Sequence, residues 1–248
     1  MTLVKLTSVA VLALALGACQ SLFQPNMRTP LEVKRDRWEH IKPGCSNADC
    51  PLVNIDTIHF PANPKLDGIV EKRLLQLTQD NERSALPVSL KAYEEQFMAS
   101  AESRNSSYLQ AKVREQHDGL VIIELSSYLD TGGAHGMPGR GFINYSRQQD
   151  KVLTLQDMLV PGQEATFWKT AEEAHKGWLI STGMDKDAEF VKTWPFRQTP
   201  HIALTYGAVV LKYEVYAIAP YSMGHIELKI PYPRLNGVIK PELFPGRG

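Results

Sequence analysis

His135 is the residue best placed for chemistry, because it lies in the glycine-rich segment YLDTGGAHG, which runs from Tyr128 to Gly136. A histidine in such a turn is exposed enough to act as a general base or as a ligand. Gly132, Gly133 and Gly136 permit positive φ angles and a close approach to the backbone. We expect a tight turn in which His135 hydrogen-bonds neighbouring backbone, with ligand contact and catalysis as the alternatives.

A second set of candidates is aromatic. Tyr216 and Tyr221 flank an Ala-Pro pair in the segment YAIAPYSMG. Such tyrosines often bury the ring while the hydroxyl bonds to backbone, and they can also form a platform for a ligand. We favour the structural role for both. Trp194 and Phe196 lie in a long irregular stretch, where they could either anchor a protein interface or cover the core.

Motifs typical of enzymes are absent from the chain. There is no GxSxG nucleophile elbow, no HExxH zinc motif and no phosphate-binding P-loop. A Ser-His-Asp arrangement around His135 would rest on choosing among many serines and aspartates. We therefore predict no catalytic residue and no cofactor.

Cys45 and Cys50 enclose a loop of four residues, which suits a disulfide in an exported protein. The rival interpretation is a zinc site completed by His40 and His59. It is weaker, because the CxxC spacing of structural zinc sites and a second close ligand pair are both missing. We predict the disulfide and no metal.

Composition restricts the class of partner. The chain has 248 residues, enough for one large domain or two small ones, and Lys+Arg and Asp+Glu both number 27. Phosphate binding needs a basic surplus or stripe, so nothing here points to nucleic acid. After residue 18 there is no apolar run long enough to cross a membrane.

The N-terminus carries a candidate for lipidation. Lys5 precedes the apolar run Val9–Leu16, and Gly17 and Ala18 come directly before Cys19. This pattern resembles a bacterial lipoprotein signal peptide, which implies removal of residues 1–18 and acylation of Cys19. Gln20 replaces the Asp that would favour the inner membrane, so we expect a periplasmic protein anchored to the outer membrane. The alternative is a secretory peptide with a chance cysteine.

Hydrophobic periodicity outlines the first half of the chain. Residues 19–50 are polar and proline-containing and read as a tether with a stapled loop. A strand is expected over residues 53–60, followed by a helix over 66–77 and a second helix with Ser89 as its cap. Alternating residues at 109–114 and 121–126, joined by Asp-Gly, predict a β-hairpin.

The second half continues the same mixture of elements. A further hairpin is expected from residues 142–147 and 152–155, and a helix over 165–182. Residues 183–200 read as irregular, and strands follow at 202–206, 209–216 and 226–230. The fold class is therefore α+β, with mostly antiparallel sheets, packed helices and two closely associated subdomains.

Several motifs together point to a family. The turn TGGAHG, the segment LTLQDML at 153–159, the Tyr-x-Ile-Ala-Pro-Tyr-x-x-Gly segment at 216–224 and the Ile-Pro-Tyr at 230–232 resemble exported bacterial proteins of the RsiV type. These proteins carry DUF4163 and DUF3298 domains. The resemblance implies a DUF4163-like subdomain over residues 51–140 and a DUF3298-like subdomain over 141–248.

The resemblance also suggests a role. The best-understood member is a membrane-anchored anti-sigma factor whose exported part binds lysozyme, and a deacetylase relative carries its chemistry in a separate domain. The present chain shows neither a sigma-binding segment nor a deacetylase domain. What the resemblance implies is a non-catalytic binding module for lysozyme or a cell-wall-associated ligand. The alternatives are a cell-envelope hydrolase using His135 and a structural envelope protein assembling through Trp194 and Phe196.

Overall fold

The computed structural model describes residue 27, residues 29–79 and residues 85–246. The leader at residues 1–18 and the lipidation candidate Cys19 lie outside this range. Among the helices described, none combines the length and the apolar character that crossing a bilayer requires.

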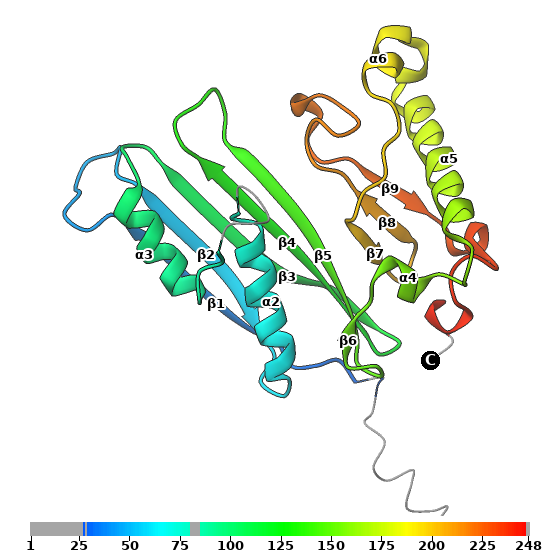
Figure 1. Ribbon diagram of the computed structural model, residues 1–248, viewed down its shortest axis with the longest axis horizontal. Coiled ribbons are helices and arrows are strands. Elements are labelled where there is room, and N and C mark those ends of the chain that lie inside the picture. The colour runs from blue at the N-terminus through cyan, green and yellow to red at the C-terminus, as the bar shows by residue number, and fades with distance from the viewer. Residues whose placement is uncertain (1–26, 28, 80–84, 247–248) are drawn as a thin grey trace, which may run out of the picture.

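A six-stranded sheet forms the first layer, in the order β1-β2-β3-β4-β5-β6 (Figure 1). All neighbouring strands are antiparallel except β2 and β3, which are parallel. The strands are β1 (Lys34–Ile41), β2 (Leu52–His59), β3 (Ser106–His117), β4 (Leu120–Asp130), β5 (Met137–Ser146) and β6 (Lys151–Val152).

Two helices make the crossover between the parallel strands and cover one face of this sheet (Figure 1). In α2 (Pro64–Gln76), proline takes the first helical position and the Asn63 side chain accepts the N–H of Leu66. In α3 (Leu90–Ser100), the Ser89 hydroxyl caps the N–H of Ala92, as its sequence position predicted. Both helices start where a side chain can satisfy their first free N–H groups.

The structure corrects two boundaries from the sequence analysis. Residues 34–41 were assigned to the tether, but they form β1, which pairs along its whole length with β2. Five of its eight side chains are charged and all except Trp38 are exposed, so the strand lacks the apolar alternation that identifies strands. The boundary expected between residues 140 and 141 falls inside β5, so the first sheet extends as far as β6.

The second layer is a three-stranded antiparallel sheet backed by a long helix (Figure 1). Here β8 is shorter than the predicted 209–216, and a six-residue helix interrupts the stretch expected to be irregular. The residues before the sheet form α4 (Leu155–Met158), α5 (Glu164–Thr182) and α6 (Ala188–Thr193). The strands are β7 (Ile202–Leu204), β8 (Val209–Lys212) and β9 (Glu227–Ile230).

Strand β4 contributes to both hydrophobic cores. Val121, Ile123 and Leu125 pack with α2 and α3 in the first core. Leu120 and Ile122 pack in the second core, between the large sheet, α5 and the small sheet. The two subdomains are therefore closely associated, as predicted, because they share a strand.

The predicted disulfide between Cys45 and Cys50 is confirmed, with the two Cα atoms 5.7 Å apart. It closes the connection between β1 and β2. Both thiols are thus consumed, and His40 contacts Glu94 instead of a metal site.

We expect the double substitution Cys45→Ser/Cys50→Ser to lower the free energy of unfolding by about 2 kcal/mol, since opening this short loop frees the unfolded chain. Urea unfolding with and without reductant measures this change. Reductant should bring the unaltered protein to the stability of the double variant and leave the variant unchanged. A variant as stable as the unaltered, oxidised protein would contradict the prediction.

Candidate functional site

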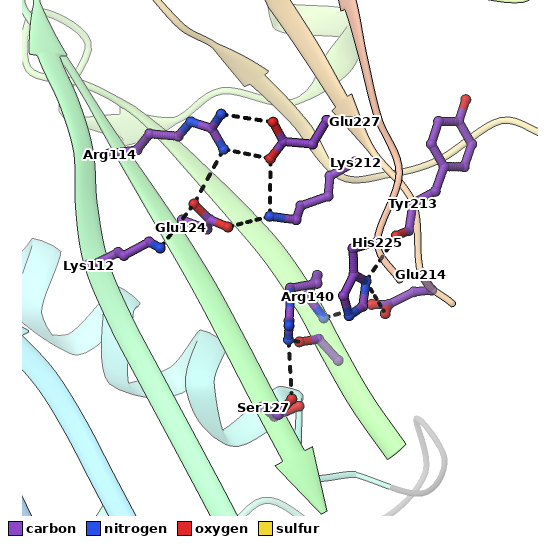
Figure 2. A network of polar contacts seen from close by, with 11 residues as sticks. Lys112, Arg114, Glu124, Ser127, Arg140, Lys212, Tyr213, Glu214, His225 and Glu227 are labelled. Atoms are coloured by element: carbon purple, nitrogen blue, oxygen red, sulfur yellow. Dashed lines mark hydrogen bonds and ion pairs between the residues drawn. The ribbon is translucent and has the colours of Figure 1, made fainter. Parts of the chain in front are cut away.

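The two sheets are joined by a network of ion pairs at their interface (Figure 2). Arg114 of β3 makes a two-pronged contact with Glu227 of β9, with distances of 2.8 and 3.0 Å. Lys212 of β8 bonds to Glu124 of β4 and lies 3.1 Å from Glu227. Arg114 also approaches Glu124 at 3.3 Å, and Lys112 approaches it at 3.7 Å. Each sheet thus supplies both acid and base, which fixes one orientation between the sheets.

The cations keep both carboxylates ionised. Hydrogen bonds from Arg114 outweigh the effect of burial and, with Lys212, lower the pKa of Glu227 to about 2. Burial would raise the pKa of Glu124, but the bond from Lys212 and the neighbouring positive charges lower it below its ordinary value.

A second polar cluster centres on Glu214, just after β8. Its Oε1 accepts the backbone N–H of Arg140 on β5 at 2.7 Å and lies 3.4 Å from Nε2 of His201. Its Oε2 lies 3.7 Å from Nδ1 of His225, is buried and has no hydrogen-bond partner among the described residues. Burial raises the pKa of Glu214, but the bonds from His201 and Arg140 outweigh it and lower the pKa overall.

His225 is held in its neutral form by this environment. Its Nδ1 lies 3.0 Å from the Tyr213 carbonyl oxygen, which can only accept, so Nδ1 carries the proton. Its Nε2 is buried and forms no hydrogen bond within the part of the chain that the structure describes. Burial, and then the positive charge of Arg140, lower the pKa of His225.

Five of the candidate ligand-binding residues predicted from the sequence meet near the C-terminal end of β4. We call this group the aromatic cluster: Tyr128, His135, Trp194, Tyr216 and Tyr221. The His135 ring stacks on Tyr221 with centroids 3.9 Å apart. Tyr216 contacts the rings of His135, Tyr221 and Trp194 at centroid distances of 6.1, 5.6 and 6.4 Å. Three segments that lie far apart in the chain therefore build one surface.

Hydrogen bonds tie the cluster together through the glycine-rich turn. His135 Nε2 lies 3.0 Å from the Tyr216 hydroxyl, and its Nδ1 lies 3.1 Å from the Gly136 carbonyl. The Tyr221 hydroxyl donates to the same carbonyl at 3.1 Å, and the Gly136 N–H donates to the Tyr128 hydroxyl at 3.2 Å. Both nitrogens of His135 are thus engaged by the protein itself.

At two of the three glycines of the turn, the structure disfavours any residue with a side chain. Gly132 has a φ of 87°, where side chains are disfavoured. A Cβ on Gly136 would lie 2.4 Å from the Tyr128 ring, so only glycine allows that ring to pack against the turn. Gly133 has neither feature.

Tyr216 is held in an unusual conformation. Its φ is 65°, a region that bulky residues rarely occupy, and its side chain remains 47% exposed. Such an arrangement persists only where the surroundings enforce it, and it is common at functional positions.

Phe196 does not join the aromatic cluster. Its ring packs against His175 of α5, with centroids 5.8 Å apart, and is half-buried over the second core. Of the two roles left open from the sequence, the structure places Phe196 in core packing.

The sequence analysis did not predict the ion-pair network between the two sheets or the polar cluster around Glu214. Glu124 interrupts the apolar run at the start of β4, and Lys212 ends the apolar strand β8; these charges beside apolar runs are the signal that could have identified them. Arg140 and Glu214 gave no comparable pattern. Within the described residues, no group of three or more His, Cys, Asp or Glu side chains is arranged to hold a metal ion.

Comparisons with known proteins give a consistent assignment. The family model described as "Protein of unknown function (DUF3298)" matches residues 156–233. The crystal structure of a DUF3298 family protein from Pseudomonas aeruginosa PAO1 is 68% identical, covers 90% of this chain and 100% of its own, and has a TM-score of 0.86.

A more distant structure shares the fold. A member of the DUF3298 family from Bacteroides fragilis NCTC 9343 is 18% identical, covers 86% of this chain and 94% of its own, and has a TM-score of 0.64. No curated protein matches the chain.

We expect Lys212→Met to lower the free energy of unfolding by about 3 kcal/mol, because it leaves buried carboxylates short of a cation. Urea unfolding measures the change. Lys229→Met, which removes an exposed lysine from the neighbouring strand, is the matched control and should change stability little. Equal effects of the two substitutions would show that the network does not hold the sheets together.

We expect stability to fall as the pH drops below about 6.5, because the unfolded state then binds a proton that buried His225 resists. The contribution of His225 is present above that pH and is lost as the pH falls through its lowered pKa. His225→Gln should therefore flatten the dependence of the urea midpoint on pH between neutrality and about pH 5.

The matched control for this experiment is His59→Gln, whose ring is 48% exposed. His225→Gln should flatten the pH dependence more than this variant does. A His225→Gln variant with an unchanged slope would contradict the assigned role of His225.

Proposed function

Because the chain belongs to the DUF3298 family, we propose that it is a non-catalytic binding module whose contact surface is the aromatic cluster. We further propose that it is a lipoprotein anchored at Cys19 to the periplasmic face of the outer membrane. Its partner would be lysozyme or another cell-wall-associated protein or glycan. By the RsiV-type resemblance, the first sheet would correspond to a DUF4163-like subdomain.

The observation that carries the proposal is the exposed ring of Tyr216, which packs against the rings of three other residues of the aromatic cluster. Its positive φ costs conformational energy, and the contacts with His135, Trp194 and Tyr221 offset that cost. Tyrosine and tryptophan side chains dominate the binding energy of protein interfaces, and rigid support reduces the entropy lost on binding.

The hydrogen bonding of His135 favours binding over hydrolysis. A general base needs a free nitrogen within reach of the substrate proton. Since Nδ1 faces a carbonyl it carries the proton, and Nε2 accepts the Tyr216 hydroxyl. Hydrolysis through His135 would require that bond to break and the stacked ring to leave Tyr221.

Charge near the cluster suits a cationic partner such as lysozyme. The turn 130–136 and the segment 184–194 carry four carboxylates, Asp130, Asp185, Asp187 and Glu189, against two lysines, Lys186 and Lys192. Acidic residues in the segments that carry His135 and Trp194 would help to attract a basic protein.

The fold would present this surface away from the membrane. Three residues after Cys19 contact the fold: Arg147 donates to the carbonyls of Met27 and Thr29, and the Gln116 side chain bonds to the backbone of Leu31. These contacts lie by the β3–β4 turn, at the opposite end of β4 from the aromatic cluster (Figure 1). An 11-residue strand separates the two ends by about 35 Å.

We expect the detergent-solubilised protein to bind immobilised c-type lysozyme saturably at physiological salt, measured by surface plasmon resonance. Tyr216→Ala should weaken binding by about 2 kcal/mol, or roughly 30-fold, because it removes the central ring of the surface.

The matched control is Tyr206→Ala, which removes a tyrosine that is 59% exposed and also contacts a histidine ring, that of His117. This variant should bind like the unaltered protein. Equal losses in the two variants would exclude the aromatic cluster as the contact surface, and no binding by the unaltered protein would exclude lysozyme.

A further inference from the structure

A cavity of about 670 Å³ lies between α2, β5 and the segment 198–202. This volume is within the range of small-ligand sites. Its lining combines apolar rings, those of Phe142 and Trp168, with polar and charged groups. None of the aromatic cluster's residues is among the described residues that line it, so it is a separate site.

The cavity is positively charged. Arg73 and Arg140 line it, and the described lining contains no aspartate or glutamate. In a chain whose acidic and basic residues are equal in number, this is a local excess of cations. An anionic ligand group would be attracted here.

Arg140 lacks a counter-charge on its guanidinium. Nη1 donates to the carbonyls of Gly139 at 2.7 Å and Ser127 at 3.3 Å, and no carboxylate of the described residues lies within ion-pair distance. Glu214 accepts the backbone N–H of Arg140, not its side chain. Burial lowers the pKa of Arg140, and the charges of Glu214 and Glu124, which lie farther away, offset this effect only in part.

The edge of β5 adds main-chain groups to the same cavity. The Arg140 N–H and the Asn144 C=O point away from β4, toward Glu214 and Leu153 respectively. Alternation along an antiparallel strand then directs the N–H and C=O of Phe142 the same way. Neither group bonds to any described residue, since β6 pairs only with Tyr145 and Ser146.

We propose that this cavity binds a short, extended peptide with a free C-terminal carboxylate. The peptide backbone pairs with Phe142 at the open edge of β5, as in other strand additions. Arg140 receives the carboxylate, because a guanidinium fork matches its geometry, and Arg73 adds positive charge. A lone inorganic anion would use the arginines but leave the edge of β5 and the apolar rings without a partner.

The test uses N-acetyl-trialanine with a free carboxylate and the same peptide with a C-terminal amide, each titrated calorimetrically into the full-length, detergent-solubilised protein. We expect the acid to bind at least about tenfold more tightly than the amide, and more tightly than acetate. This comparison needs no variant, so it does not depend on the folding of any substitution.

Arg140→Met, which keeps an apolar stem, should weaken binding of the acid by about tenfold and leave binding of the amide unchanged. Arg37→Met removes an exposed arginine from β1 and is the matched control. Tyr216→Ala should not change peptide binding, so failure of this proposal and failure of the lysozyme proposal are distinguishable.

Three results would overturn the proposal. They are equal affinity for the acid and amide peptides, acetate binding as tightly as the peptide acid, and no binding of either peptide at millimolar concentration.

Discussion

Burial of β4 on both faces is the constraint on which the rest of the structure depends. Odd-numbered residues from Val121 to Leu125 complete the core under α2 and α3, while Leu120 and Ile122 complete the core shared with the small sheet. Neither core is closed without this strand, so the two subdomains have to fold against each other. The residues matched by the DUF3298 family model, 156–233, therefore do not contain all of the strands that close the second core.

Glu124 makes the contact between β4 and the small sheet specific for one orientation. Apolar burial alone would let the small sheet slide or rotate on β4, because the hydrophobic effect is non-directional. A carboxylate within the buried face must be matched by a cation, and the small sheet supplies Lys212 to Glu124 while its Glu227 binds Arg114 of the large sheet. Both pairs form together in one arrangement of the two sheets. The network's main contribution is thus to orientation, which in turn places Glu214 against β5 and the rings of the aromatic cluster against one another.

The sequence predicted those parts of the fold in which local pattern and tertiary role agree. The α2 and α3 helices, the Asp-Gly hairpin and the Cys45–Cys50 disulfide all carry short-range signals, and all are present. It failed for β1, because a charged edge strand has no apolar period, although such charges are what protect an exposed sheet edge. Five of the candidate ligand residues converge in the aromatic cluster, but Phe196 does not, since two aromatics in one loop can face different partners. The pairing of Arg140 with Glu214 joins residues 74 positions apart and could not be read from spacing.

The segment from Glu214 to Tyr216 connects the two candidate binding surfaces. Glu214 holds the backbone of Arg140, whose guanidinium lines the cavity beside β5. Val215 is buried, and the positive φ of Tyr216 then turns the chain so that its ring lies over His135 and Tyr221. The segment 214–216 must meet two requirements: Glu214 is fixed to the large sheet, and the Tyr216 ring is exposed two residues later. The positive φ of Tyr216 is the consequence of meeting both.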